Sequence, residues 1–297
     1  MFPLTSDEPL LLEEVSVYGG NEGNEDSAAR LRGASLALAK GEWLAVVGIN
    51  GSGKSTLARL LAGFSVERMS GFVQRGFAGE EISSIVLQQP RAQLFGETPR
   101  EEVAFALEWR GIDAERREEL TERALERVGL SLSADQPWHR LSGGQQQLAA
   151  IAAATACGMK LLVMDEATSM LDEENRDLVI QVVREIHREG TAVLWVTQRL
   201  DELEAEDRVV AIDSGRIAYD GGARAFLYGE PGSAGRDAPP EAVSPCLRAG
   251  LRLPYLMELA LELRRLGKLN DPLPMTEREW QRVWGNIGND ETARGER

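Results

Sequence analysis

Apolar runs alternate with helical patterns along most of the chain. The runs that are typical of strands covered on both faces of a sheet lie at residues 43–47, 82–87, 161–164 and 191–196. Residues 10–18 and 34–39 also have the composition of strands, and residues 19–27 between them form an acidic loop. A helix is predicted over residues 54–62. This alternation predicts an α/β domain built on a mainly parallel sheet.

The pattern becomes helical between residues 98 and 157. Helices are predicted at residues 101–109, 114–128 and 144–157, with no convincing strand among them. We therefore expect a helical subdomain, at about residues 96–157, that is inserted into a main domain spanning residues 1–228.

A final segment begins at about residue 229. Gly, Pro, Ser and Ala dominate residues 229–244, as in a flexible connection. Further on, Thr276 and Glu279 fit a capping box that opens a short helix. A leucine stripe at helical spacing precedes them, at Leu256, Leu259, Leu263 and Leu266. Residues 229–297 are therefore predicted to be a linker and a small, mainly helical extension, whose stripe packs on its own domain or contributes to pairing.

Composition and charge limit the classes of protein to which this chain can belong. Hydrophobic residues make up 43% of the chain and charged residues 27%, which excludes a wholly disordered or collagen-like chain. The 33 Lys and Arg residues against 48 Asp and Glu residues give a net charge of −15, which repels phosphate backbones, so we expect no nucleic-acid partner. Cys157 and Cys246 lie far apart, which excludes a disulfide framework and a cysteine-based zinc site.

The chain offers no segment that we expect to enter a membrane. Residues 1–14 carry no cationic segment ahead of an apolar one, so we expect no secretory signal and a location inside the cell. The best candidate span, residues 148–164, is mostly alanine and is interrupted by polar residues. Any membrane contact would therefore be supplied by another subunit.

One string has the spacing of a phosphate-binding loop. Residues 48–56 satisfy G-x-x-x-x-G-K-[ST] between an apolar run and a predicted helix. Glycines let the backbone wrap a triphosphate, and the helix N-terminus favours its negative charge. Lys54 would reach the β- and γ-phosphates and Ser55 would bind Mg²⁺. The remaining predicted ATP-binding residues of the string are Gly48, Asn50, Gly51, Ser52, Gly53 and Thr56. The alternative is that the whole string is an incidental Gly-rich turn.

This loop alone does not separate kinases, GTPases and transport ATPases. The apolar run at residues 161–164 is followed by two acidic residues. Asp165 would hold the metal ion, and Glu166 would act as the base that polarises water for in-line attack. Standing alone, the two would be better interpreted as solvated carboxylates at a strand end.

Residues 141–145 read Leu-Ser-Gly-Gly-Gln and open an alanine-rich helix. This string resembles the signature of ATP-binding cassette ATPases, and the order of the motifs along the chain is similar to that family throughout. The resemblance implies a P-loop NTPase (RecA-like) core with an antiparallel β subdomain and an inserted helical subdomain. In that family the signature serves the ATP held by the opposite subunit, a role that would fall to Ser142, Gly143, Gly144 and Gln145. By itself the string could be a flexible helix cap.

Three further positions match the same family. Tyr18 resembles the aromatic residue that stacks on adenine, although a strand-end tyrosine at the rim of the core also fits. Gln88 resembles the glutamine that senses the metal ion and the water. Asp172 ends a Ser-Met-Leu-Asp string similar to the loop that connects the two sites of a dimer, and it also fits a helix N-cap.

One position departs from the family. Gln198 stands where the family has a switch histidine, and neither His139 nor His187 is placed to take that role. An amide can donate a hydrogen bond to the γ-phosphate but cannot carry the imidazolium charge. Two hypotheses follow: this subunit's ATP is cut slowly while a partner's site turns over faster, or Glu166 suffices as the base and Gln198 is a tolerated variant.

Two strings narrow the resemblance to energy-coupling factor ATPases. Residues 88–96 read Gln-Gln-Pro-Arg-Ala-Gln-Leu-Phe-Gly and residues 101–105 read Glu-Glu-Val-Ala-Phe, similar to strings of that subfamily. The tail from Leu253 to Gly267 resembles its carboxy-terminal extension. Gln89 replaces the usual Asn, and the loop at residues 19–27 is longer than is typical.

The resemblance implies a motor subunit that uses ATP and Mg²⁺ to drive an importer for a vitamin or a transition metal ion, at the cytoplasmic face of the membrane. Its implied partners are a second cassette ATPase, which we expect to form a heterodimer, a transmembrane coupling subunit and a membrane substrate-binding subunit. Helices of the coupling subunit would dock in a groove between the Gln88 turn and the helical insertion. The alternatives are a weakly hydrolytic, nucleotide-gated partner and a soluble cassette ATPase without a membrane partner.

Overall fold

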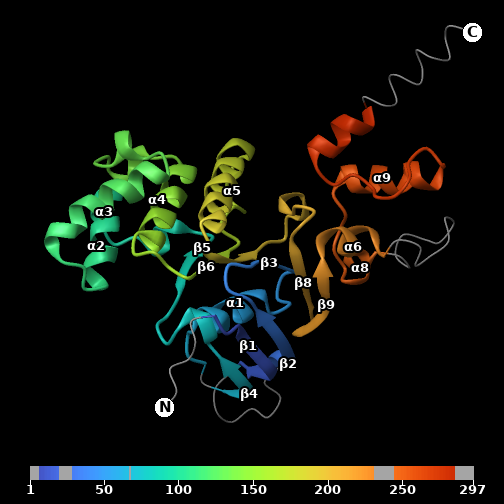
Figure 1. Cartoon of the computed structure of the whole chain (residues 1–297), viewed down its shortest axis with the longest axis horizontal. Helices are drawn as coiled ribbons and strands as arrows, with labels where there is room; N and C mark the ends of the chain where they lie inside the picture. The colour runs from blue at the N-terminus through green and yellow to red at the C-terminus, as the bar shows by residue number, and fades with distance from the viewer. Residues whose placement is uncertain (1–6, 20–28, 67, 231–243, 285–297) are drawn as a thin grey trace, which may run out of the picture.

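The computed structural model describes residues 7–19, 29–66, 68–230 and 244–284, and its centre is a six-stranded sheet (Figure 1). Neighbouring strands from β5 to β8 are parallel, and β9 runs antiparallel to β8. The predicted α/β class with a mainly parallel sheet is confirmed. The strand order is β5 (Ser84–Leu87), β6 (Leu161–Asp165), β7 (Ala192–Val196), β3 (Trp43–Val47), β8 (Arg208–Asp213) and β9 (Arg216–Gly222).

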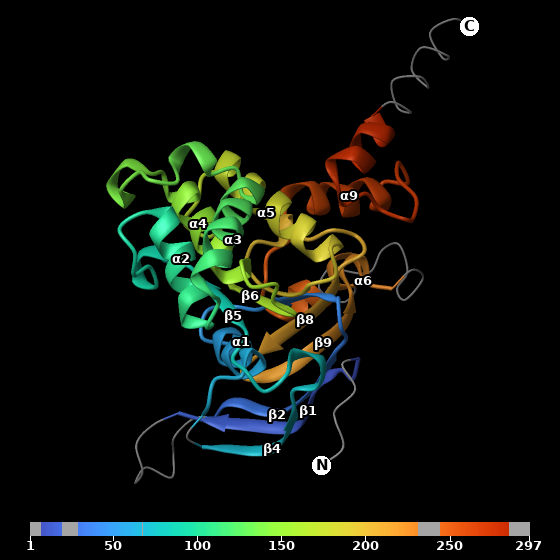
Figure 2. The same cartoon turned by 60° about the vertical axis from the view of Figure 1, so that its left-hand side comes forward.

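A smaller antiparallel sheet lies below the central one (Figure 2). Its strand order is β2 (Ala29–Leu38), β1 (Leu10–Tyr18) and β4 (Met69–Gln74). Helix α1 (Lys54–Ala62) lies between the two sheets, and its Leu57 and Leu61 are fully buried in a cluster that contains Leu12 of β1 and Val163 of β6. Because α1 is clamped from both sides, the loop that precedes it is held in a fixed position.

The opposite face of the central sheet is covered by helices. These are α2 (Pro99–Trp109), α3 (Ala114–Arg127), α4 (Gly143–Thr155) and α5 (Glu173–Arg188). Val86, Met164 and Trp195 point from three strands into the cluster that these helices bury. The three helices predicted between residues 98 and 157 are confirmed with shifts of one or two residues at their ends. Among the described residues, no helix is both long and apolar enough to cross a bilayer.

The carboxy-terminal helices pack on the same face, beside β3 and β8. They are α6 (Ala223–Tyr228), α8 (Pro245–Arg248), α9 (Tyr255–Arg265) and a helical segment at residues 277–284. The predicted capping box is confirmed: the Glu279 N–H donates to the Thr276 hydroxyl at 3.3 Å, and the Thr276 N–H donates to the Glu279 carboxylate at 3.2 Å. Residues 231–243 of the predicted linker lie outside the described residues.

The predicted helix is present as α9, but only part of its predicted leucine stripe packs on its own domain. Met257, Ala260 and Leu261 are the buried residues, whereas Leu256 and Leu266 are exposed. Leu259 and Leu263 lie between these two sets and pack at the edge of the same cluster. Two apolar stripes overlap on this helix, and contact with α6, not spacing, selects the one that is buried.

Three strands were missing from the sequence-based prediction, and β2 begins five residues earlier than the predicted residue 34. Strand β4 is almost wholly exposed and contains a glycine at φ +94°, so it has no apolar run. Strands β8 and β9 were not predicted because the turn at residues 214–215 separates them and charged residues lie close to their ends. The predicted acidic loop at residues 19–27 lies almost wholly outside the described residues.

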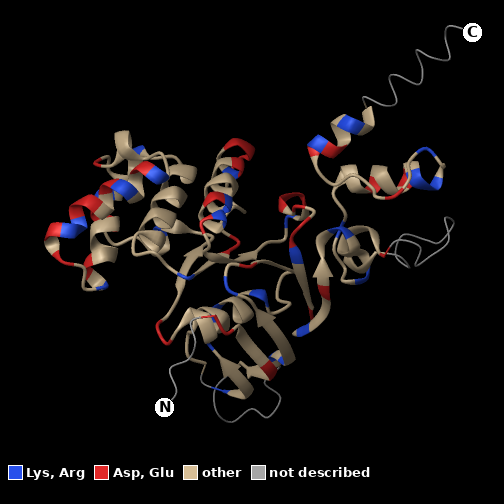
Figure 3. Cartoon of the chain, viewed as in Figure 1, with Lys and Arg blue, Asp and Glu red and all other residues tan. Residues whose placement is uncertain are grey.

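Acidic and basic residues are interspersed on the helical layer (Figure 3). Arg117 of α3 pairs with Glu108 of α2 at 2.8 Å, and Arg123 pairs with Glu119 one turn away on α3. Exposed pairs of this kind contribute at most about 1 kcal/mol each. The helical layer is therefore held to the sheet mainly by its buried apolar cluster.

Candidate functional site

The loop between β3 and α1 is shaped by three glycines with positive φ angles. Gly48 has φ +153°, and a Cβ there would lie 2.4 Å from the Ile212 carbonyl oxygen. Gly53 has φ +115°, and its Cβ would lie 2.5 Å from the Arg30 carbonyl oxygen. Gly51, at φ +78°, faces open space. The backbone is thus wrapped tightly on one side and open on the other, as a loop that cradles phosphates must be.

This loop opens on a cavity of about 570 Å³. The cavity collects residues from four separate segments of the chain. The predicted site residues that line it are Asn50, Gly51, Gly53, Lys54, Ser55, Thr56, Gln88, Asp165 and Glu166. Ser52 is buried within the loop itself. The fold therefore brings together the phosphate-binding loop, the glutamine turn after β5 and the acidic end of β6.

Lys54 is buried although it carries a charge. Its ammonium donates to the carbonyl oxygens of Gly48 at 3.0 Å and Ile49 at 3.1 Å, and it lies 3.3 Å from Oε1 of Glu166. A buried ammonium is stable only with such partners. The three contacts hold the positive charge at the floor of the cavity, facing the carboxylate.

Ser55 and Asp165 meet at the same edge. The Ser55 hydroxyl donates to Oδ1 of Asp165 at 3.1 Å. Burial raises the pKa of Asp165 above its usual range, the Glu166 charge raises it further, and the Ser55 hydrogen bond, Arg59 and Lys54 lower it. A hydroxyl and a partly desolvated carboxylate are hard oxygen donors of the kind that Mg²⁺ prefers. The residues present thus fit a magnesium ion.

Gln198 joins this site from the end of β7. Its Nε2 donates to Oε1 of Glu166 at 2.8 Å and to Oδ1 of Asn50 at 2.7 Å. Both hydrogens of the amide are therefore used, one toward the acidic strand end and one toward the phosphate-binding loop. Glu166 itself has φ +53°, an uncommon conformation for a residue with a side chain, and its N–H donates to the Val196 carbonyl oxygen at 3.0 Å. The predicted switch position lies where it can act on both partners.

Tyr18 lies beside the phosphate cavity, at the end of β1. It is 39% exposed and lines a second hollow of about 580 Å³, whose wall includes Ser55 and Thr56. The guanidinium of Arg68 lies 5.8 Å from the ring centroid. An exposed ring next to the first turn of α1 is placed to stack on a base whose phosphates lie at the loop.

Arg30 is a site residue that the sequence analysis did not find. It is exposed and lines both the phosphate cavity and the hollow at Tyr18. Arg30 belongs to no motif, and only the pairing of β2 with β1, which sets Ala29 opposite Tyr18, brings it here. Its position adds a second positive charge beside the phosphate-binding loop.

The signature residues lie elsewhere. Ser142 caps α4 in a capping box, accepting from the Gln145 N–H at 3.2 Å and donating its own N–H to the Gln145 side chain at 2.9 Å. Asp172 caps α5 by accepting from the Asn175 N–H at 2.9 Å, so the predicted N-cap is confirmed. Neither residue lines the cavity at the phosphate-binding loop. The predicted site residues thus lie in two separate places on the chain.

These two helix starts are packed together through Gly144. A Cβ on Gly144 would lie 2.1 Å from Oδ1 of Asn175, whereas a Cβ on Gly143 would meet only Leu171, at 3.6 Å. Glycine at position 144 therefore permits a close approach of α4 to α5 that carries the signature next to Asp172.

The fold and these converging loops define an ATP-binding cassette ATPase, a class that binds and hydrolyses ATP. The family described as "ABC transporter" matches residues 31–169. The energy-coupling factor transporter ATP-binding protein EcfA1 of Bacillus subtilis is 36% identical over 80% of this chain and 83% of its own length. EcfA1 of Lacticaseibacillus paracasei is 38% identical over 80% of this chain and 84% of its own length. The chain belongs to the family of energy-coupling factor transporter ATP-binding proteins, and the predicted resemblance is confirmed.

Solved structures agree with this assignment. CbiO1 of Clostridium perfringens, described as part of the ABC transporter complex cbiONQ, is 26% identical with a TM-score of 0.62, over 73% of this chain and 90% of that chain. The ATP-binding cassette MJ0796, in a dimeric post-hydrolysis state bound to ADP and Pi, has a TM-score of 0.61 at 21% identity, over 73% of this chain and 100% of that chain. The predicted cassette fold is confirmed.

Replacing Gly144 with Ala should lower the free energy of unfolding by about 1–3 kcal/mol, because the new methyl group collides with Asn175. Gly143→Ala is the matched control and should be neutral or slightly stabilising, since Ala favours the helix and its Cβ meets only Leu171. Urea denaturation of the two variants measures both values. Equal stabilities would contradict the close approach of α4 to α5.

Replacing Arg30 with Ala should raise KM for ATP about three- to fivefold with kcat little changed, because an exposed contact between charges contributes about 1 kcal/mol or less. Arg32→Ala is the control, since Arg32 is exposed on the same strand but lines neither hollow. Steady-state ATPase kinetics at low and high salt give the comparison. The same KM in both variants would show that Arg30 does not contact the nucleotide.

Proposed function

We propose that this chain is the ATP-hydrolysing motor subunit of an energy-coupling-factor importer. The observation that carries this proposal is the convergence of Lys54, Ser55, Asp165 and Glu166 on one cavity, with Gln198 hydrogen-bonded to Glu166. Relatives from the energy-coupling factor family support the importer over other uses of the same chemistry.

In this proposal the P-loop N–H groups and Lys54 bind the β- and γ-phosphates. Ser55, Asp165 and Gln88 would hold Mg²⁺, which would neutralise charge on the phosphate oxygens. Glu166 accepts a proton from a water whose oxygen attacks the γ-phosphorus, while the bond to the β,γ-bridging oxygen breaks and ADP and phosphate are released. The Gln198 amide keeps one hydrogen on the Glu166 carboxylate, and the hydrogen that it donates to Asn50 in this structure turns to the γ-phosphate.

The signature residues form a second half-site, which completes the ATP site of another subunit. Ser142, Gly143, Gly144 and Gln145 open α4 away from the phosphate cavity of their own chain. The free N–H groups of this helix start favour a phosphate supplied by a partner, with Asp172 beside it. This arrangement supports a dimer with a second cassette ATPase, and we expect a heterodimer in which the two sites differ at the switch position.

A groove on the helical layer supports a membrane partner. Its volume is about 410 Å³, and it lies between α2, α4 and β5. Phe95 and Trp109 at its rim are 76% and 82% exposed, and the Phe105 ring lies between them, tilted by 33° to each. Exposed aromatic groups around an apolar hollow suit an inserted helix. We therefore place the transmembrane coupling subunit here, with this chain peripheral at the cytoplasmic face.

The imported solute is set by a separate membrane substrate-binding subunit, and a vitamin or a transition metal ion is the class that we propose. The proposed division of the chain is a cassette domain at residues 1–228, with the helical subdomain at about residues 96–157, and an extension at residues 229–297. The cluster that Leu253 and Met257 share with Val47 and Val209 supports an extension that moves with the cassette domain.

The test of this function is ATP turnover by the assembled complex. Glu166→Gln should lower kcat by about 10²–10⁴-fold, the usual contribution of a general base, while ATP still binds. A complex whose kcat does not change would contradict the role of Glu166, and retained transport would contradict the motor function.

Gln198 favours a second candidate, a weakly hydrolytic partner in a heterodimer. Gln198→His in the assembled complex should raise turnover if the amide limits this site, because the imidazolium adds a positive charge at the γ-phosphate. Gln198→Ala is the companion variant, which frees Glu166 and Asn50 from the hydrogen bonds. An unchanged rate in the histidine variant would contradict the asymmetry of the two sites.

A further inference from the structure

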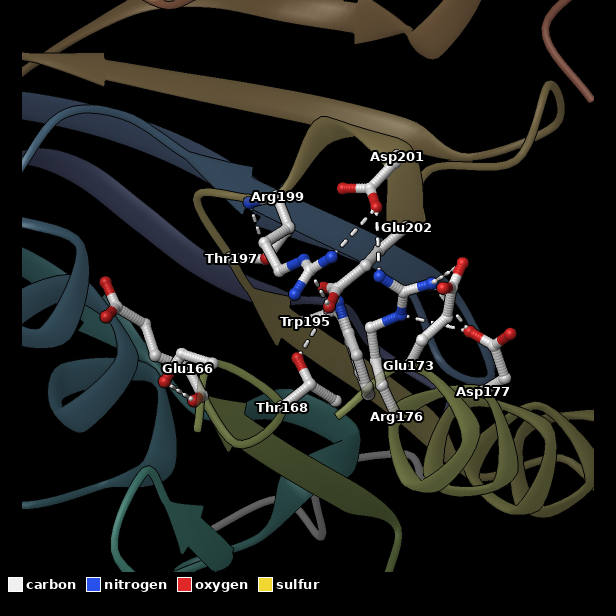
Figure 4. A network of polar contacts seen from close by, with 11 residues as sticks. Glu166, Thr168, Glu173, Arg176, Asp177, Trp195, Thr197, Arg199, Asp201 and Glu202 are labelled. Carbon is white, nitrogen blue, oxygen red and sulfur yellow. Dashed lines mark hydrogen bonds and ion pairs between the residues drawn. The ribbon is translucent and has the colours of Figure 1, made fainter. Parts of the chain in front are cut away.

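Glu202 is a buried carboxylate that the proposed mechanism does not use. It ends the short helix η5 (Leu200–Glu202) after Gln198, and its side chain is 1% exposed. Its Oε1 accepts from the Thr168 hydroxyl at 2.6 Å, and its Oε2 accepts from the Trp195 indole N–H at 3.0 Å (Figure 4). A carboxylate is costly to bury, so such a position is retained only where its hydrogen bonds hold something in place.

The charges around Glu202 are directed to other partners. Arg199 lies 4.0 Å from Oε1 of Glu202 but donates to Asp201 at 3.2 Å. Arg176 contacts Asp201 at 3.1 Å and Asp177 at 2.9 Å (Figure 4). Glu202 is therefore held mainly by two neutral donors, and these donors lie on different segments of the chain.

Those segments carry the two residues placed at the γ-phosphate. Thr168 lies two residues after Glu166, and Glu202 lies four residues after Gln198. The Gln198 amide already contacts Glu166 at 2.8 Å. The Thr168–Glu202 hydrogen bond adds a second side-chain tie between the same two loops, and the Trp195 N–H anchors it to β7. The Gln198 contact and the backbone bond from the Glu166 N–H to the Val196 carbonyl oxygen act at Glu166 itself, and the Thr168 contact holds the loop two residues further on.

We propose that Glu202 is a positioning residue that locks the loop of residues 166–172 to the loop after β7, so that the carboxylate of Glu166 is aimed at the attacking water. The inference rests on the proposed ATPase function.

The kinetic test compares Thr168→Val, Thr168→Ser and Glu202→Ala in the assembled complex. Thr168→Val keeps the shape but loses the hydroxyl, and we expect kcat to fall roughly 10- to 100-fold with KM for ATP within about twofold, since loss of one charge-assisted hydrogen bond is of that size. Thr168→Ser keeps the hydroxyl and should restore kcat. The double variant Thr168→Val/Glu202→Ala should have the same kcat as Glu202→Ala alone, because each single substitution already removes the Thr168–Glu202 hydrogen bond.

Thr155→Val is the matched control, because Thr155 is a buried threonine whose hydroxyl donates only within its own helix. Its kcat should remain near that of the wild type. A kcat for Thr168→Val equal to that of this control would overturn the inference, as would a parallel rise in KM.

Amide hydrogen exchange separates this inference from the proposed function. In Thr168→Val and Glu202→Ala, exchange should accelerate in residues 166–172 but not in the phosphate-binding loop, whether or not the complex hydrolyses ATP. Absence of turnover in the wild-type complex would contradict the proposed function alone. Unchanged exchange in residues 166–172 would overturn the role of Glu202.

Discussion

Three neighbouring parallel strands, β6, β7 and β3, end at the same edge of the central sheet, and the nucleotide site depends on this constraint. Each strand delivers one component of the site: Glu166 follows β6, Gln198 follows β7, and Asn50 follows β3. The Gln198 amide then donates to both neighbours, at 2.8 and 2.7 Å, and so joins the three strand ends. Parallel pairing makes the site possible, and one side-chain amide closes it.

The same edge explains why the site is both rigid and incomplete. Helix α1 is buried between two sheets, so Lys54 and Ser55 cannot shift relative to Asp165. The signature at Ser142 opens on a different helix and does not reach this cavity. In the proposed function a second subunit completes the reaction centre. Closure and opening of that pair would then provide the motion that a membrane partner at the aromatic groove uses.

The sequence predicted those parts of the molecule that depend on local pattern. Strand β3, helix α1 and the loop between them follow from apolar runs and obligatory glycines, and Asp165, Glu166 and Gln198 fell where the motifs placed them. Strand β4 was missed because an exposed edge strand has no apolar run. Arg30 and Glu202 were missed because strand pairing and burial place them, and neither leaves a local signal. On α9, overlapping stripes of apolar residues could not be ranked without the surface that covers them.

In the proposed function this chain drives a membrane protein with ATP. The most direct measurement of that coupling is to tag the chain in its own cell, solubilise the membranes gently and identify the proteins that co-purify. We expect a second cassette ATPase together with a polytopic membrane subunit, and loss of the membrane subunit alone when Trp109 at the aromatic groove is replaced with Glu. Recovery of soluble proteins only would contradict this coupling, and would leave an ATPase whose chemistry stands but whose partner lies elsewhere in the cell.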